Sequence, residues 1–298
     1  MFHRSLLVLA LIGSCCVAAE PAATSDSSWQ PVPFLTLPEG WKLGPCSAVA
    51  ENSKGEIFVF HRGEHPLIVC DASGKVLRSW GDDLIGSAHG LRIDAQDNVW
   101  VTDIGNHLVV KFDPQGKVLL KLGTGKPGDG ASEFNKPTDI AFGPSGEFYV
   151  TDGYGNSRVT KFSPSGAPLY SWGTQGYGRS QFRIPHSIVR DAKGRLLVGD
   201  RENDRIQIFD EAGKLLTVWS GFAPYGLALD AEGHVYVADG RKNEVVRLDD
   251  AGKIVARFGK KGRGAGEFDL AHMLTFDRAG SLFVTDINGQ RVQKFVRK

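Results

Sequence analysis

A segment of about 25 residues recurs six times along the chain, and this repetition constrains the fold more than any other feature of the sequence. The pattern is clearest in "VWVTDIGNHLVVKFDPQGKVLLKLG", and the first copy is the most divergent. The copies cover residues 57–81, 99–123, 148–173, 196–220, 235–259 and 282–298. Each copy follows a short apolar stretch and a polar turn, so the units repeat at roughly 40–48 residues.

Each unit alternates apolar and polar residues in runs that end at Asp-Gly or Asn-Gly turns, which is typical of antiparallel β-strands, and no helical period competes. Four antiparallel strands at this spacing predict a β-propeller blade. The sequence therefore predicts an all-β fold, a six-bladed propeller that begins near residue 44. The last unit ends after its third strand at Lys298, so we expect residues 29–40 ("WQPVPFLTLPEG") to supply the missing outer strand and close the ring.

The N-terminal residues 1–19 have the layout of a secretory signal peptide, with a basic start, a short apolar run and small residues at the end. The run is too short to span a bilayer, so no integral membrane span is expected. "IGSC" also resembles a lipoprotein processing box with Cys15 as the lipidated residue, and both routes stay open. Either route predicts an exported protein, with residues 20–28 as a flexible leader that has nothing to pack and residues 29–298 as the propeller.

Charge and cysteine content exclude several classes of protein. The net charge of +1 argues against a surface that binds nucleic acid or an anionic membrane. Only Cys46 and Cys70 follow the predicted signal peptide, so no disulfide framework is expected. The 37 glycines point instead to many turns.

Alignment of the repeats separates architecture from function, because a residue type present in every blade is expected to be structural. Aspartates recur at the end of the second strand and are predicted to accept hydrogen bonds from turn amides. These are Asp103, Asp152, Asp200, Asp239 and Asp286. His65 and His107 align with arginines of other blades at a tolerant polar position, and we interpret them as structural.

Three histidines depart from this pattern at the start of the innermost strand, which lines the central channel. They are His89, His186 and His272, in blades two, four and six, and they align with Cys46, Thr138 and Tyr225 of the other blades. Blades of a six-fold ring are about 60° apart, so alternate blades place three imidazoles about 120° apart around one axis. Three histidines with an open fourth position suit a catalytic zinc ion, and an all-imidazole set in an exported protein favours zinc over a reduced metal. A lone channel histidine would more often be a polar lining residue.

Further departures lie at the second-strand end, on one face of the predicted disc. The first blade has His61 in place of the aspartate, followed by Arg62. Arg201 occupies the equivalent position in blade four, and Tyr154 lies one position further along in blade three. Surface arginines are usually only solvated, but two of them near a metal predict a site for a carboxylate-bearing substrate, because the guanidinium fork matches a carboxylate.

These stretches resemble the NHL-repeat propeller of the peptidyl-α-hydroxyglycine α-amidating lyase (peptidylamidoglycolate lyase) family, over nearly all of residues 44–298. The specific matches include "FHRGEH" (60–65), "KPTDIA" (136–141), "DGYGNSRVTKFSPSG" (152–166), "PHSI" (185–188) and "DRENDRIQIFD" (200–210). The resemblance implies a zinc-dependent lyase that converts a peptide or small molecule with a C-terminal α-hydroxyglycine to an amide and glyoxylate. It also implies the role of each site residue: His89, His186 and His272 as zinc ligands, Tyr154 as the catalytic tyrosine, and Arg62 and Arg201 as active-site arginines.

The chain departs from the family at several positions. The resemblance places a structural calcium ion at the carbonyl groups of Val49 and Leu91, but Met273 replaces the carboxylate that follows the third histidine, which argues against the ion. Leu270 replaces a methionine of the family's "MPH" motif, and the family's disulfide cysteines are absent. No copper monooxygenase domain is present, so a hydroxylating partner is expected on a separate chain. A different N-acyl carbinolamine also stays open as substrate.

Three functions therefore remain under consideration. The first is the zinc lyase. The second is a non-catalytic NHL-repeat propeller that binds a protein or peptide on one face, which would not require three channel histidines. The third is a propeller hydrolase such as a lactonase, whose sites usually use Glu, Asp and Asn around calcium, whereas this channel offers histidines.

Overall fold

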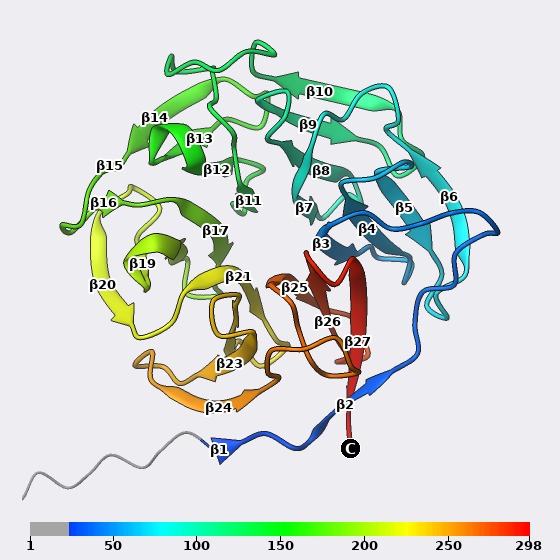
Figure 1. Ribbon diagram of the computed structural model, residues 1–298. Helices are drawn as coiled ribbons and strands as arrows, with labels where there is room; N and C mark the ends of the chain where they lie inside the picture. Colours follow the sequence, from blue (N-terminus) through cyan, green and yellow to red (C-terminus); the bar gives the residue numbers. More distant parts are fainter. Residues whose placement is uncertain (1–23) are drawn as a thin grey trace, which may run out of the picture.

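Six blade sheets, five of four strands and one of five, surround a central channel in the computed structural model, which describes residues 24–298 (Figure 1). The predicted signal peptide, residues 1–19, and the lipidation candidate Cys15 lie outside the described residues. Among residues 24–298, no helix has the length and apolar character needed to cross a membrane. The predicted all-β, six-bladed propeller is confirmed.

Each blade is an antiparallel sheet whose first strand lies at the channel and whose last strand lies at the rim. Blade one contains β3 (Cys46–Glu51), β4 (Ile57–His61), β5 (Leu67–Cys70) and β6 (Val76–Trp80). Blade two contains β7 (Ala88–Ile93), β8 (Val99–Asp103), β9 (Leu108–Phe112) and β10 (Val118–Leu122). Blade three contains β11 (Asp139–Phe142), β12 (Phe148–Asp152), β13 (Arg158–Phe162) and β14 (Pro168–Trp172).

The other three blades repeat this plan. Blade four contains β17 (Pro185–Arg190), β18 (Leu196–Asp200), β19 (Arg205–Phe209) and β20 (Leu215–Ser220). Blade five contains β21 (Pro224–Leu229), β22 (Val235–Asp239), β23 (Glu244–Leu248) and β24 (Ile254–Phe258). Blade six contains β25 (Ala271–Phe276), β26 (Leu282–Asp286), β27 (Arg291–Arg297) and β2 (Trp29–Val32). The short elements are β15 (Thr174–Gln175), β16 (Gln181–Phe182), the helical turn α1 (Gly153–Asn156) and the 3₁₀ turn η1 (Arg201–Asn203).

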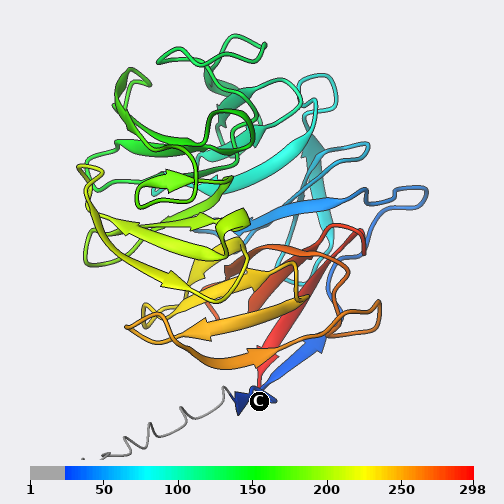
Figure 2. The same cartoon turned by 60° about the vertical axis from the view of Figure 1, so that its left-hand side comes forward.

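The N-terminal strand closes the ring, as predicted. Strand β2 pairs antiparallel with β27, so that Trp29 lies opposite Arg297, and Figure 2 shows the two strands side by side at the meeting of the chain ends. The Trp29 side chain is buried against Tyr236, Phe258 and Phe276. Blade six therefore joins the first and last parts of the chain in one sheet.

Part of the predicted leader, residues 20–28, pairs with blade five, whereas the sequence predicted that it packs against nothing. Thr24 and Ser25 form β1, which pairs in parallel with Ala256 and Arg257 of β24. The Asp26 amide continues the contact by donating to the carbonyl of Arg257. The reason is that β24 is the rim strand of blade five, and its unpaired backbone groups bind the chain as it passes toward blade six.

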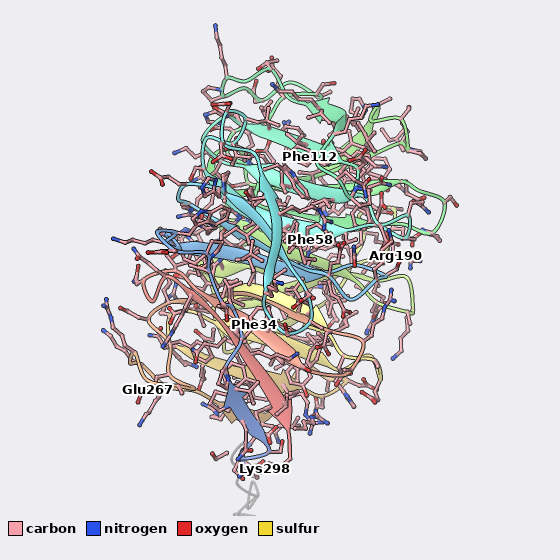
Figure 3. The ribbon with its side chains drawn as sticks, turned by 90° about the vertical axis from the view of Figure 1, so that its right-hand side faces the viewer. Phe34, Phe58, Phe112, Arg190, Glu267 and Lys298 are labelled. Atoms are coloured by element: carbon pink, nitrogen blue, oxygen red, sulfur yellow. The ribbon has the colours of Figure 1, made fainter. Side chains whose placement is uncertain are left out.

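Large apolar side chains pack between neighbouring blades and hold them at a fixed spacing. Trp80 of blade one contacts Phe58 of its own sheet and Phe112 of blade two, and its ring centroid is 6.1 and 6.2 Å from theirs. Figure 3 labels Phe58 and Phe112 on the two neighbouring blades. The indole lies against Gly116, in the last turn of blade two, where a Cβ would come within 2.7 Å of the ring. That turn requires glycine because of this close approach and because its φ is +92°. The channel strands are thereby fixed in rigid walls.

The histidines His65 and His107 occupy a different repeat position from the one predicted. Both have left-handed backbone, with φ of 57° and 56°. His107 directly precedes β9, and His65 is separated from β5 by Pro66 alone. The other blades have the same conformation at this position, in Ser157, Asp204, Asn243 and Gln290. Such a residue ends the hairpin loop between the second and third strands of a blade, so the alignment with arginines was one residue out. The structural interpretation of the two histidines therefore concerns this turn.

Candidate metal centre

The structure brings the three predicted histidines together at the channel axis. His89, His186 and His272 are each the second residue of an innermost strand, and each is at most 2% exposed. Their ring centroids are 4.6 to 5.0 Å apart. One ring nitrogen of each lies within 4.8 Å of the others, which is close enough for all three to ligate one ion.

Hydrogen bonds to neighbouring blades fix which nitrogen of each ring faces the axis. The Nδ1 of His89 is 2.7 Å from the carbonyl oxygen of Thr138. The equivalent distances are 2.6 Å from His186 to Tyr225 and 2.6 Å from His272 to Ser47. A carbonyl oxygen only accepts, so each Nδ1 carries the proton and donates. The three Nε2 atoms therefore face one another as bare acceptors, the arrangement expected around a cation.

The carbonyl acceptors come from equivalent positions of blades three, five and one, Thr138, Tyr225 and Ser47. The structure corrects the predicted alignment at the last of these positions. Sequence alignment places Cys46 at the histidine level, whereas Ser47 occupies it. Cys46 pairs directly with His61, and a β-bulge between Cys46 and Ala48 takes in Ser47. Bulges in other inner strands likewise place His186 out of register. A bulge re-aims the side chain it carries, and here it turns the imidazole toward the axis.

Burial keeps the three imidazoles neutral, which is the state that binds metal. Desolvation lowers the pKa of His272 to about 3, and the cationic Arg62 and Arg201 add to the effect. The pKa values of His89 and His186 are likewise lowered, first by burial and then by neighbouring positive groups. The donor set of three neutral imidazoles fits a zinc ion.

Tyr154 lies directly beside the bare nitrogens. Its hydroxyl oxygen is 3.1 Å from Nε2 of His89 and 3.2 Å from Nε2 of His186. The preceding Gly153 allows this approach, because a Cβ there would meet the carbonyl oxygen of Pro185 at 2.2 Å. The turn α1 can thus rest against the strand that carries His186, and the phenol reaches the axis.

Arg201 is held over the same point by two aromatic rings and a carboxylate. Its guanidinium carbon is 5.4 Å from the ring centroid of Tyr154 and 4.8 Å from that of Tyr225, distances typical of cation–π contacts. Its Nη1 donates to the Tyr154 hydroxyl at 3.3 Å, and its Nε donates to Glu202 at 2.8 Å. Sequence reasoning missed Tyr225 as a site residue, although its alignment with the histidines was the signal that could have found it.

Arg62 approaches from the opposite side with most of its donors unused. Its Nε donates to the carbonyl of Ala88 at 2.9 Å. Within residues 24–298, no carboxylate forms an ion pair with it, and its terminal nitrogens have no acceptor at hydrogen-bond distance. Burial lowers the pKa of this guanidinium from its usual range. A partly buried cation with unused donors is suited to an anionic ligand.

His61, which replaces the repeat aspartate, is part of the framework. In blade four, Asp200 accepts from the amide of Arg183 at 2.7 Å, and the Nδ1 of His61 accepts in the same way from Gly44 at 3.1 Å. Its Nε2 donates to the carbonyl of His65 at 3.1 Å. Burial lowers the pKa of His61 to about 4. The residue is thus a neutral substitute for the carboxylate.

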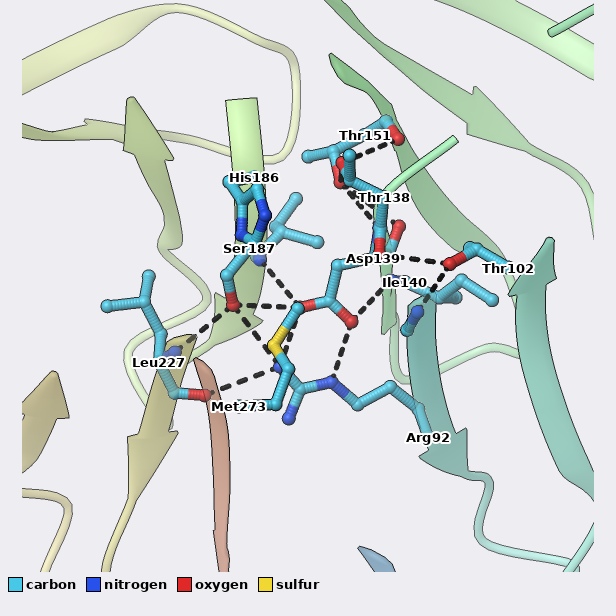
Figure 4. Close-up of polar contacts among 12 residues, drawn as sticks. Arg92, Thr102, Thr138, Asp139, Ile140, Thr151, His186, Ser187, Leu227 and Met273 are labelled. Carbon is cyan, nitrogen blue, oxygen red and sulfur yellow. Dashed lines mark hydrogen bonds and ion pairs between the residues drawn. The ribbon is translucent and has the colours of Figure 1, made fainter. Parts of the chain in front are cut away.

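The residues assigned to a calcium ion by resemblance include no carboxylate. Val49 and Leu91 lie on the inner strands β3 and β7, and Met273 follows His272 on β25 with only 3% exposure. A thioether is a poor ligand for a hard cation. Next to Leu91, the side chain of Arg92 enters the channel and pairs with Asp139 (Figure 4). The channel below the histidines therefore already contains a cation.

Comparison with known proteins gives relatives of two kinds. The family model of the NHL repeat matches residues 86–112, 134–162 and 182–209. NHL repeat-containing protein 3 of Homo sapiens is 30% identical over 301 residues, which cover 90% of this chain and 86% of the relative. Peptidyl-glycine alpha-amidating monooxygenase B of Xenopus laevis is 37% identical over 217 residues. Peptidyl-alpha-hydroxyglycine alpha-amidating lyase 1 of Drosophila melanogaster is 34% identical over 206 residues.

The length shared with the second kind of relative is limited. The match covers 62% of this chain but 24% of the frog protein, and 56% of this chain but 38% of the fly protein. Among solved structures, a streptogramin B lyase superimposes with a TM-score of 0.67 over 91% of this chain and 98% of that chain. Its sequence is 16% identical, so it supports the propeller fold alone.

Proposed function

The chain belongs to the NHL-repeat protein family, and we propose that it is a zinc-dependent lyase acting on an N-acyl-α-hydroxyglycine. Relatives named as peptidyl-α-hydroxyglycine α-amidating lyases support this activity. The observation that carries the proposal is the convergence of three bare imidazole nitrogens, one phenol and two guanidiniums on a single point of the channel. A propeller that only binds a partner has no need of this arrangement.

The proposed reaction breaks the bond between the hydroxyl-bearing carbon and the amide nitrogen. Tyr154, as phenolate, accepts the hydroxyl proton, and the released electron pair forms the carbonyl of glyoxylate. The C–N bond pair moves to nitrogen, and the Tyr154 phenol returns the proton there. The amide and glyoxylate together contain every atom of the substrate. A zinc ion bound by the three histidines would supply Lewis acidity toward a substrate oxygen.

The two arginines have different roles in this proposal. Arg201 already donates to the Tyr154 hydroxyl and to Glu202, so its charge stabilises the phenolate and fixes the phenol in place. Arg62 keeps its terminal nitrogens for the ligand, and a bidentate pair with the substrate carboxylate would satisfy them. The carboxylate thereby orients the hydroxyl toward Tyr154.

The substrate would reach this protein from another reaction. We propose that a hydroxylating monooxygenase on a separate chain supplies the α-hydroxyglycine, and that both steps take place after export. A peptide with a C-terminal α-hydroxyglycine and a small N-acyl analogue share the groups that the site would contact.

The proposal is tested by incubating the purified, zinc-loaded protein with N-benzoyl-α-hydroxyglycine and measuring glyoxylate and benzamide. We expect equal amounts of the two products, above the rate in a protein-free control. N-benzoylglycine, which lacks the hydroxyl, should give neither product. If zinc-loaded protein releases no glyoxylate from either the benzoyl compound or a peptide substrate, the chain is not this lyase and the non-catalytic binding propeller becomes the better account.

A further inference from the structure

We infer that Arg92 serves as the structural cation of the central channel, so that the chain holds its inner strands together without a calcium ion. This inference concerns the part of the channel below the three histidines and does not depend on the lyase activity. The residues expected around calcium, Val49, Leu91 and Met273, include no charged side chain. Leu91 is followed directly by Arg92, whose guanidinium pairs with Asp139.

The ion pair between Arg92 and Asp139 is bidentate and crosses from blade two to blade three. The Nε of Arg92 donates to one carboxylate oxygen at 2.9 Å, and its Nη2 donates to the other at 2.6 Å. Asp139 is fully buried, and the Arg92 side chain is 20% exposed. The Nη2 also lies 3.3 Å from the carbonyl oxygen of Leu227 on blade five. The Nη2 also donates to the hydroxyl of Ser187 on blade four at 3.4 Å. One guanidinium therefore links blade two with blades three, four and five, as a multidentate metal ion would.

The same carboxylate organises the strand that carries His186. Asp139 accepts from the hydroxyl of Ser187 at 2.8 Å and from the amide of Ile188 at 3.0 Å, and both residues follow His186 directly on β17. The Ser187 hydroxyl in turn accepts from the amide of Leu227 at 3.1 Å. Figure 4 shows these contacts converging on Asp139 just below His186. The pair thereby supports the geometry of the histidines above it.

This network leaves no unused carboxylate for a second cation. The Asp139 carboxylate already accepts five hydrogen bonds, because the amide of Ile140 adds one at 2.8 Å. Calcium takes six to eight oxygen ligands, including carboxylates. Met273, whose side chain points into the same part of the channel in Figure 4, offers only a thioether. The charges of Arg92 and Asp139 cancel, so a divalent ion at this position would add positive charge that no anionic group compensates.

The test compares thermal unfolding in EGTA and in millimolar calcium for zinc-loaded protein, with terbium luminescence as a direct probe of the cation site. The wild-type Tm should not change with calcium, and terbium should not bind stoichiometrically. Arg92→Ala should lower the Tm by roughly 5–15 °C, because it leaves a buried carboxylate unpaired. Arg92→Lys keeps the charge but cannot form the bidentate pair, so its Tm should lie between those of the wild type and Arg92→Ala. This variant also tests the inference if Arg92→Ala does not fold.

A double variant and a surface control make the result specific. Arg92→Ala combined with Met273→Asp removes the guanidinium and restores a carboxylate, so its Tm should rise with calcium and terbium should bind once per chain. Arg190→Ala breaks a partly exposed pair with Glu211 and should lower the Tm by less than Arg92→Ala. Stoichiometric terbium binding by the wild type, or an unchanged Tm in Arg92→Ala, would overturn the inference.

Discussion

At the scale of single residues, Tyr154 is the side chain on which the proposed chemistry depends. Replacing Tyr154 with Phe keeps the ring but removes the proton acceptor, so we expect turnover of N-benzoyl-α-hydroxyglycine to fall by at least ~10²-fold. Zinc content should be unchanged, since the histidines remain. Tyr177→Phe, which alters a phenol that is 72% exposed, is the matched control and should keep full activity. Near-normal turnover by Tyr154→Phe would assign the proton transfer to another group.

The unused donors of Arg62 predict an effect on substrate binding. Arg62→Ala should raise KM for carboxylate substrates by roughly 10–100-fold, the value of a charge-assisted hydrogen bond. Arg62→Lys should recover only part of this loss, because an ammonium group cannot form the bidentate pair. Steady-state kinetics with N-benzoyl-α-hydroxyglycine and its methyl ester provide the measurement. If Arg62→Ala affects the acid and the ester equally, Arg62 does not bind the carboxylate.

His61 predicts how stability depends on pH. Its pKa is about 4 in the folded protein and about 6.5 in the unfolded chain, so the unfolded state takes up a proton first as the pH falls. The contribution of His61 to stability is therefore constant above pH 6.5 and falls by about 3 kcal/mol between pH 6.5 and 4. His61→Asn keeps an acceptor for the Gly44 amide but does not titrate. Urea unfolding should show a shallower acid decline in this variant, and identical declines would contradict the assignment.

The residues that sequence could not predict are those whose position depends on a β-bulge or whose partner lies on another blade. The three histidines were predictable because the repeat register maps directly onto the ring. By contrast, Ser47 was missed because a β-bulge shifts the inner strand by one residue, and bulges leave no mark in an apolar pattern. Arg92 and Asp139 lie on different blades, and each alone resembles an ordinary polar residue of a strand.

At the scale of elements, strand β2 carries the closure of the ring. The indole of Trp29 is only 6% exposed and fills the gap between blades five and six. We expect Trp29→Ala to lower the free energy of unfolding by about 3–5 kcal/mol, as for other large-to-small core changes.

Deleting residues 29–40 should abolish soluble, cooperatively unfolding protein, because β27 becomes an open edge. A deletion variant with unchanged thermal stability would show that β2 does not close the ring.

At the scale of the whole molecule, the six-fold ring builds a three-fold site. Blades two, four and six supply the imidazoles, and blades three, five and one supply the carbonyl groups that orient them. The sequence repeat made the fold and the three histidine ligands predictable together, because the repeat period defines both the blades and the position of each histidine within its blade. The charged groups around the centre, Arg62 and Arg201, break the symmetry, and in the proposed function these blade-specific residues select the substrate.

The most direct measurement determines metal content and glyoxylate release in the same samples of wild-type protein, His186→Ala and His234→Ala. His234 lies in a turn with Asp230 and Glu232, the other described group of side chains close enough to hold a metal ion, and serves as the control for binding there. The account predicts about one zinc per chain and full activity in the wild type and in His234→Ala. It predicts loss of both zinc and glyoxylate release in His186→Ala, because a three-ligand site loses a bond. Stoichiometric zinc and undiminished glyoxylate release in His186→Ala would contradict it.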